Sequence, residues 1–333
     1  MRKPFSSQAT RGIMATLLTI IFAAPLHSSA QTRHSDYPAK PIRLIALSSP
    51  GSGPDILGRL IAARLLETWG QPVIVDARPG ASGIIGTEIA ANAAPDGHTL
   101  VIITSQAAIV AAMYDKLKYD LVKDFSPISL MGTTPFLLVV HPSVPVTSVS
   151  EFIKHAKSRP GTMRYGSGGS GSPPHLCAEI LKSMTGMDIQ HIPYKGVTPA
   201  MTDTMAGQVQ MLISVIPAVL PSVTAGKLRA LGVTSAKRTP IVPDLPAIAE
   251  TVAGYEFIGW YSVFAPAKTP REIIDKLNVE LVKMAKSADM RTRLTTIGVD
   301  TLGSSVQELS AHLPKQIEKM RDAVKTSGAK VDR

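Results

Sequence analysis

The stretch IRLIALSSPGSGPDILGRLIAARL, residues 42–65, runs from an apolar segment through a glycine-serine loop into a helical pattern. Residues 42–47 are mostly apolar and alternate little, which is typical of a buried strand. Pro54 follows the loop, and proline is favoured at the first position of a helix. From there leucine and isoleucine recur at helical spacing as far as Leu65. The stretch therefore predicts a strand, a loop and a helix whose N-terminus faces the loop.

The order strand, loop, helix, strand, turn, helix, strand occurs twice in the chain. The second copy begins at Met163 with MRYGSGGSGSPP, another strand and glycine-serine loop followed by prolines at a helix start. Two copies of one unit predict two similar α/β lobes, each with a mainly parallel sheet. The expected pieces are a strand at 42–47, a helix from 54 stopped by Gly70, a strand and turn at 72–80, a helix at 87–94 and a strand at 98–105; then strand, loop and helix at 163–186, a strand and turn at 187–196, a helix opening at Pro199 with Thr198 as N-cap, and a strand at 209–217.

Both glycine-serine loops lie where α/β sheets bind ligands, at the carboxyl ends of strands and against helix N-termini. Free backbone N–H groups there bind carboxylate or phosphate without a cationic side chain. Serine hydroxyls at Ser49, Ser52, Ser170 and Ser172 can add hydrogen bonds, or can simply cap their loops. Two lobes that face one another across a hinge would hold one small anion between these loops.

Composition argues against several other kinds of partner. The formal charge is +10, but the basic residues are scattered and aromatic residues make up only 5% of the chain. Platforms for stacking nucleic-acid bases need more aromatic side chains than this, so no nucleic acid is expected as a partner. The eight histidines are dispersed, and the single cysteine, Cys177, falls on an apolar helix face. No metal site is therefore expected.

Enzyme motifs fail on their spacing. Gly51 and Gly53 with Asp76 are reminiscent of a dinucleotide fingerprint, but its third glycine falls on Ile56. Neither loop has the Gly-Lys-Ser/Thr of a phosphate-binding loop or the Gly-x-Ser-x-Gly of a hydrolase elbow. His175 stands beside a serine-rich loop, but its place in the first turn of a helix favours capping or touching a ligand. No catalytic residue and no cofactor are expected, and an exported enzyme acting on a carboxylate or its ester is the weaker alternative.

Residues 1–30 predict a cleaved secretory signal. Basic residues precede an apolar run at 12–26, and small residues lead to Ala30. The apolar run is short for a transmembrane helix, and no other long apolar run follows. An exported protein is the expectation.

Longer stretches resemble the Bug family, the extracytoplasmic solute receptors of tripartite tricarboxylate transporters. The similarity is carried by residues 37–102, 165–211, 226–250 and 259–270, and continues into the closing helices. It implies a type II periplasmic-binding-protein fold with two hinge crossings, and a location in the periplasm. It also implies a small organic carboxylate as ligand and a membrane permease of a tripartite tricarboxylate transporter as partner. Presentation of the ligand to a sensor histidine kinase is the alternative that the sequence leaves open.

On this fold, residues 31–137 and 258–333 are expected to form a discontinuous first lobe and residues 138–257 the second lobe. The C-terminal segment is helical in pattern from Pro270 onward, and Pro314 must start or kink a helix. These closing helices are expected to pack on the first lobe.

The resemblance also places the ligand-binding residues. The first ligand loop of the family reads Pro-Gly-Gly-x-x-Asp, which Pro50, Gly51 and Asp55 match while Ser52 replaces a glycine. Other family loops match the residues after the third strand, the second glycine-serine loop and a Tyr-Lys-Gly turn. The expected ligand-binding residues are Ser49, Gly51, Ser52, Gly53, Asp55, Ser105, Gln106, Gly168, Ser170, Ser172, His175, Tyr194, Lys195, Gly196 and Asp203.

Several roles stay open at this point. Lys195 could attract a carboxylate or be a solvated lysine at a strand end. For Asp55 and Asp203, orienting their own loops is favoured over touching a ligand. Gln210 and Ser214 stand where family members often carry aspartate, so the resemblance does not carry over one particular ligand. The apolar residues 213–219 could line a pocket for an aromatic acid or belong to the core.

Overall fold

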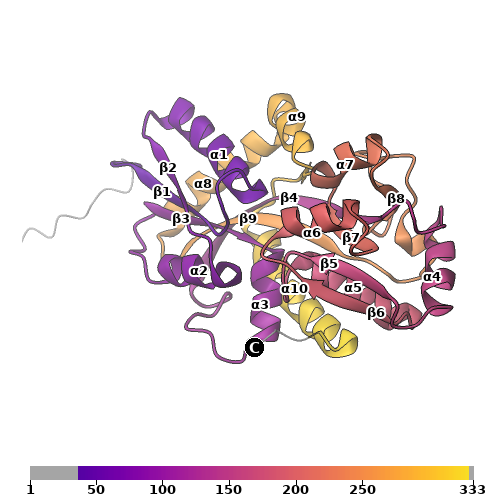
Figure 1. The fold of residues 1–333 in the computed structure, drawn as a ribbon. Helices are drawn as coiled ribbons and strands as arrows, with labels where there is room; N and C mark the ends of the chain where they lie inside the picture. The colour runs from indigo at the N-terminus through magenta and orange to yellow at the C-terminus, as the bar shows by residue number, and fades with distance from the viewer. Residues whose placement is uncertain (1–36, 330–333) are drawn as a thin grey trace, which may run out of the picture. The chain divides into compact units, whose positions relative to one another are not determined.

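A computed structural model describes residues 37–329, so the expected signal at 1–30 lies outside the described residues. One mixed sheet has the strand order β2-β1-β3-β9-β4-β7-β5-β6, and β8 and β10 both pair with β4 (Figure 1). The strands are β1 (Ile42–Ala46), β2 (Val73–Ala77), β3 (Thr99–Thr104), β4 (Phe125–Val140), β5 (Met163–Ser167), β6 (Ile189–Pro193), β7 (Met211–Val215), β8 (Arg229–Val233), β9 (Ile258–Pro266) and β10 (Asp300–Thr301).

The sheet contains two similar halves. In the first half β1 pairs in parallel with β2 and β3, and in the second half β5 pairs in parallel with β6 and β7. The order β2-β1-β3 on one side therefore corresponds to β6-β5-β7 on the other. The prediction of two similar α/β lobes is confirmed, with the repeated strands of each lobe parallel.

The sequence patterns did not predict the two long strands at the centre of the sheet, of which β4 pairs with strands of both lobes. β4 runs antiparallel to β9 over Phe125–Pro135 and antiparallel to β7 over Phe136–Val140. β9 also runs antiparallel to β3, so the sheet is mixed where the lobes meet. Nearly all of β4 is buried, and a strand covered on both faces lacks the alternation that reveals a strand in sequence. The expected lobe boundaries, 137/138 and 257/258, fall inside β4 and at the start of β9 and stay predictions.

Helices cover both faces of the sheet (Figure 1). In the first lobe Leu44 packs in a cluster with α1 and α8, whereas its neighbour Ile45 packs in the cluster that includes α3 and α10. This is the two-residue alternation expected of a strand between two helical layers. The helices are α1 (Gly53–Trp69), α2 (Ile84–Ala91), α3 (Ser105–Met113), α4 (Val149–Lys157), α5 (Pro173–Thr185), α6 (Val197–Met205), α7 (Ile216–Thr224), α8 (Arg271–Lys286), α9 (Ala288–Thr296) and α10 (Val306–Ser327), with 3-10 turns η2 (Ala81–Gly83) and η3 (Ile248–Glu250).

Two helix predictions need correction, and a third helix was not predicted. α2 begins at Ile84 instead of residue 87, because the 3-10 turn Ala81–Gly83 already starts the winding. α6 begins at Val197 with Gly196 at the N-cap, instead of at Pro199 with Thr198 as cap. Gly196 has φ 113°, a value open to glycine, so the chain enters the helix two residues earlier. α3 was not predicted, because its mostly apolar sequence shows no helical periodicity.

The C-terminal helices contact more of the molecule than expected. α8 packs on β4 and α1, in the first lobe. α10 packs on α3 but also on α5 of the second lobe, and runs beside α3 in Figure 1. The Ser183 hydroxyl donates to the Thr326 carbonyl oxygen at 3.1 Å, and Lys319 pairs with Glu256 at 2.7 Å. α10 therefore ties the two lobes together, and the chain continues helically through Pro314.

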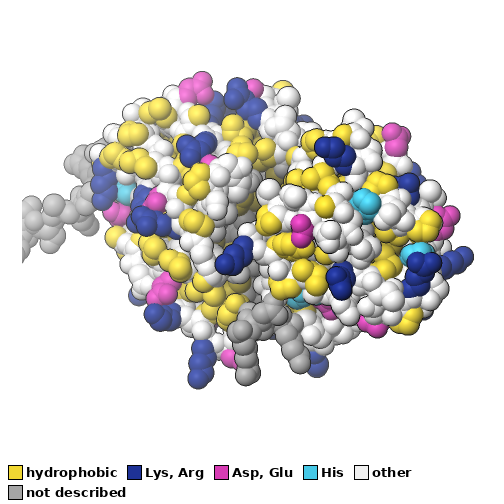
Figure 2. Space-filling model, in the orientation of Figure 1, with side chains coloured by type: hydrophobic (Ala, Val, Ile, Leu, Met, Phe, Trp, Pro, Cys, Tyr) yellow, Lys and Arg dark blue, Asp and Glu magenta, His cyan; other side chains and the backbone are white. Residues whose placement is uncertain are grey.

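Between residues 37 and 329 there is no helix with the length and apolar character needed to cross a membrane. Lysine and arginine side chains are dispersed over the face of the molecule shown in Figure 2 and do not gather into one patch.

Candidate functional site

A cavity of about 960 Å³ lies between the lobes. Its walls come from the segments that directly follow the carboxyl ends of β1, β2 and β3 in the first lobe and of β5, β6 and β7 in the second. This is the place where parallel α/β sheets bind ligands. The strands β4 and β9 also contribute lining residues, Thr134 and Phe136 from β4 and Trp260 and Tyr261 from β9.

Six helices begin at the cavity wall. The lining includes residues in the first turn, or immediately before the first turn, of α1, α2, α3, α5, α6 and α7. Each helix N-terminus carries a partial positive charge, and those that do not begin with proline or a capped N–H also present free N–H groups. α5 begins with Pro173 and Pro174 and its His175 N–H is capped by Ser172, so α5 contributes only its partial charge. Among the described residues of the lining, Lys195 is the only one with a charged side chain. The cavity is therefore suited to an anion.

The carboxylate of Asp55 stabilises the first glycine-serine loop. Asp55 accepts hydrogen bonds from the Gly51 N–H and the Arg59 Nε, both at 2.9 Å, and is only 1% exposed. The hydrogen bond from Arg59 is the main reason that the pKa of Asp55 is lowered. Ser52 lies 2.6 Å from the hydroxyl of Ser48. These contacts bend the loop so that Ser48 and Ser49 line the cavity, while Gly51, Ser52, Gly53 and Asp55 lie behind the wall.

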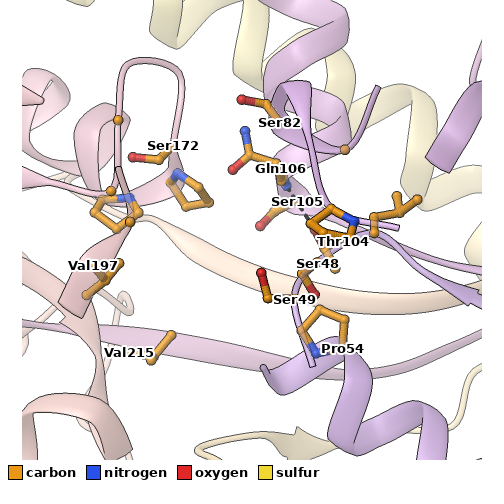
Figure 3. A pocket seen from close by; sticks show the side chains of 18 of the residues that line it. Ser48, Ser49, Pro54, Ser82, Thr104, Ser105, Gln106, Ser172, Val197 and Val215 are labelled. Atoms are coloured by element: carbon orange, nitrogen blue, oxygen red, sulfur yellow. Dashed lines mark hydrogen bonds between the residues drawn. The ribbon is translucent and has the colours of Figure 1, made fainter. Parts of the chain in front are cut away.

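The start of α3 supplies the next part of the first-lobe wall. Thr104 caps the helix by accepting from the Gln106 N–H at 3.3 Å. Ser105 and Gln106 line the cavity, and both side chains, with that of Ser82, point toward the opposite wall (Figure 3). The Gln106 side-chain amide donates to the Gly171 carbonyl oxygen of the second lobe at 2.7 Å. Gln106 thus forms a hydrogen bond across the cleft.

The second glycine-serine loop forms the facing wall. Gly168, Ser170 and Ser172 line the cavity, and Ser172 also caps α5 by accepting from the His175 N–H at 3.4 Å. His175 lies behind the wall, 4% exposed, where its Nδ1 accepts from the Gly171 N–H at 3.1 Å. Its ring stacks on His191 with centroids 4.2 Å apart. The histidine therefore supports the loop from beneath.

The turn after β6 places one basic side chain at the cavity. Lys195 and Gly196 line it, whereas Tyr194 and Asp203 do not. The Tyr194 hydroxyl donates a hydrogen bond to the Asp203 carboxylate at 2.7 Å, and this bond stabilises the turn. Desolvation, followed by this contact with Asp203, raises the pKa of Tyr194 to about 12. Lys195 itself is exposed.

Two groups of lining residues were missed by sequence reasoning. The turn Pro79–Gly83 is the counterpart, in the first repeat, of the turn at Lys195, and comparison of the two copies could have found it. Ala81 and Ser82 there have φ values of 46° and 55°, which are unusual for residues with side chains. The strands β4 and β9 add the second group, Thr134, Phe136, Trp260 and Tyr261, and no local sequence signal marks these residues.

The apolar residues 213–219 divide between core and cavity. Ile213, Ile216 and Val219 are fully buried in apolar clusters. Val215 and Ala218 line the cavity, and Val215 faces it in Figure 3. Part of this wall is therefore apolar, opposite the hydroxyl-rich first-lobe wall.

Comparison with known proteins finds full-length relatives. The family profile described as the tripartite tricarboxylate transporter family receptor matches residues 57–329. Protein BugT of Bordetella pertussis is 34% identical over 325 residues, covering 96% of this chain and 99% of the relative. A UPF0065 protein of the tcbD–tcbE intergenic region of Pseudomonas sp. strain P51 is 32% identical and covers 95% of each chain.

Solved structures of similar sequence also have a similar fold. The structure of Rpa4515 of R. palustris with adipate has a TM-score of 0.82 and 38% identity, covering 89% of this chain and 100% of that chain. MatC (Rpa3494) from Rhodopseudomonas palustris with bound malate has a TM-score of 0.76 and 29% identity, covering 86% of this chain and 100% of that chain. The periplasmic binding protein BugD is also similar, with a TM-score of 0.78.

Proposed function

The chain belongs to the tripartite tricarboxylate transporter receptor family, and on this premise we propose that it is a periplasmic receptor for a small organic carboxylate. The observation that carries the proposal is the cavity between the lobes, where six helix N-termini and Lys195 meet and where none of the described lining residues carries a carboxylate. Such an environment stabilises a carboxylate through backbone N–H groups and a favourable field. Relatives with similar folds were solved with adipate and with malate.

We further propose that the ligand-bound form delivers its acid to the membrane permease of a tripartite tricarboxylate transporter. The family description supports this partner. The family and its structural neighbours are solute-binding proteins, and the proposal accordingly includes no catalytic step. Presentation to a sensor histidine kinase finds no support in the relatives named above. Export would depend on the expected signal at residues 1–30.

Isothermal titration calorimetry of the mature chain tests the proposal. The panel contains monocarboxylates, dicarboxylates including succinate, malate and adipate, and tricarboxylates including citrate. At least one acid is expected to bind with a Kd of about 1 μM or lower. If no acid in the panel binds, the proposed function is wrong.

A pair of matched variants tests whether the acid binds in the cleft. Ser49 and Ser150 are both exposed serines, but only Ser49 lines the cavity. Ser49→Trp should abolish binding of the tightest acid because the indole occupies the space between the lobes, while Ser150→Trp should bind as the wild type does. Unchanged binding by Ser49→Trp would show that the acid binds elsewhere.

A further inference from the structure

Tyr261 is a residue of strand β9 that lines the cavity. It pairs in the sheet with Thr104, the last residue of β3, and with Gly132 of β4. Its side chain is 8% exposed, so more than nine-tenths of it is buried. The backbone pairing fixes the ring at the floor of the cleft, in the first-lobe part of the sheet.

The hydroxyl group of Tyr261 has no hydrogen-bond partner within residues 37–329, unlike the hydroxyl groups of four other tyrosines. A buried phenol normally finds a partner, since leaving it unpaired costs free energy. Four other tyrosine hydroxyls donate hydrogen bonds: Tyr37 to the Gly97 carbonyl, Tyr165 to Glu179, Tyr194 to Asp203 and Tyr255 to the Cys177 carbonyl.

Gly53 provides the space for this hydroxyl. A Cβ atom at Gly53 would lie 2.6 Å from the Tyr261 hydroxyl oxygen, so only glycine leaves room for the phenol there. Gly53 is the first residue of α1, and the hydroxyl therefore lies at the positive end of that helix. The free donor and the helix N-terminus are two independent features that favour an electron-rich oxygen at the same place.

We propose that the Tyr261 hydroxyl donates a hydrogen bond to an acceptor oxygen of the ligand, and that Tyr261 thereby selects ligands with oxygen acceptors at both ends. This inference rests on the proposed function. The second-lobe wall, with Lys195, holds one carboxylate, and the phenol at the first-lobe floor receives the other end of the molecule. The class of ligand is a dicarboxylate or an acid whose far end carries a carbonyl oxygen.

The chemistry of the site separates such ligands from plain monoacids. A site built to hydrogen-bond an oxygen rejects an analogue that lacks it, because the buried group is then left unpaired. Burial raises the pKa of Tyr261 to about 12, so the phenol stays protonated and remains a donor at physiological pH.

The test uses ligands of one length that differ at one end: adipate with hexanoate, and succinate with butyrate. Calorimetry compares the wild type with Tyr261→Phe, which removes only the hydroxyl. Tyr255→Phe is the matched control, because Tyr255 is fully buried away from the cavity and bonds to the Cys177 carbonyl. Thermal melting of each variant confirms that it is folded.

The wild type should bind the diacid of at least one pair more tightly than its monoacid. Tyr261→Phe should weaken that diacid about tenfold or more, as expected for a lost hydrogen bond to a charged group, and change the monoacid less than about twofold. Tyr255→Phe should leave both affinities within about twofold of the wild type.

Three results would overturn the inference while the proposed function stands. The wild type could bind an acid of the panel but prefer neither diacid to its monoacid. The Tyr261→Phe variant could keep the wild-type affinity for the diacid, or could lose affinity for diacid and monoacid equally. A wild type that binds no acid at all would instead overturn the proposed function, and this inference with it.

Discussion

At the scale of single residues, the acids near the cavity hold the walls that surround it. Asp55 is 1% exposed and binds the Gly51 N–H and Arg59, while Asp203 accepts a hydrogen bond from Tyr194. Neither acid lines the space between the lobes, and each carboxylate accepts hydrogen bonds from neighbouring donors. An anion can therefore occupy the cavity without facing these negative charges directly.

The first prediction concerns Asp55. Its pKa is lowered in the folded protein, chiefly by the hydrogen bond from Arg59 and against the opposing effect of burial. A lowered pKa means that Asp55 stabilises the fold above its unfolded pKa of about 3.9, and that this stability is lost as the pH falls through the lower folded value. Asp55→Asn should lower the free energy of unfolding by about 2 kcal/mol at pH 7 and reduce the loss of stability below pH ~4.

Urea unfolding between pH 3 and pH 7 measures both effects. Asp289→Asn is the control, because its ion pair with Arg293 is exposed on both sides and should contribute little. Equal stability of Asp55→Asn and the wild type at pH 7 would contradict the assigned role.

At the scale of elements, α3 is the helix that connects the two walls. Its first turn contributes Gln106, which bonds to Gly171 of the second-lobe loop at 2.7 Å. Its last residue, Met113, lies against the same loop, since a Cβ at Gly171 would be 3.3 Å from the Met113 sulfur. Gly171 has φ 76°, a conformation that favours glycine, and this turns its carbonyl group toward Gln106. The loop is thus held by a helix of the other lobe.

Removal of this connection should weaken ligand binding. Gln106→Ala leaves the second-lobe loop without its bond to the first lobe, and we expect the Kd of the tightest acid to rise about fivefold, the amount that corresponds to one hydrogen bond of ~1 kcal/mol. Calorimetry provides the measurement, and Gln307→Ala, an exposed position at the start of α10, provides the control. A Gln106→Ala variant with wild-type affinity would show that the bond across the cleft does not contribute to binding.

At the scale of the whole molecule, three elements connect the lobes. β4 pairs with β9 in one part of the sheet and with β7 in the other, the segment that leads into β9 bonds through the Phe257 N–H to the Thr234 carbonyl beside β8, and α10 packs on α3 of the first lobe and α5 of the second. Any opening of the cleft must bend β4 and the segment before β9, and must shift contacts along α10. Such limited connections are typical of hinge motion between lobes around a ligand.

Ligand binding is therefore expected to close the cleft. An acid that contacts both walls stabilises the closed arrangement, whereas a ligand that touches one lobe has no differential affinity and closes nothing. Small-angle X-ray scattering should give a smaller radius of gyration with a saturating acid than without it. The Ser49→Trp variant should show no change on addition of the acid. A radius that stays constant for the wild type while calorimetry shows binding would contradict closure.

The sequence by itself determined the two repeats and the position of their ligand loops. Prolines at helix starts, glycines at turns and serines at N-caps act over a few residues, so their effects can be read locally. Ser49, Ser105, Gln106, Ser170, Ser172 and Lys195 were named from such patterns or from the family resemblance, and all six line the cavity. Their contact with a ligand stays a prediction.

Only the tertiary structure decided which other residues complete the cleft. Trp260 and Tyr261 lie on a buried strand that pairs with residues more than a hundred positions earlier, such as Thr104. Asp55 and His175 do not line the cavity but support its loops from behind. Asp55 does so through its hydrogen bond with Arg59, and His175 through its hydrogen bond with Gly171. Local patterns predict how a segment folds, but the partner of a buried side chain depends on which distant segments the sheet brings together.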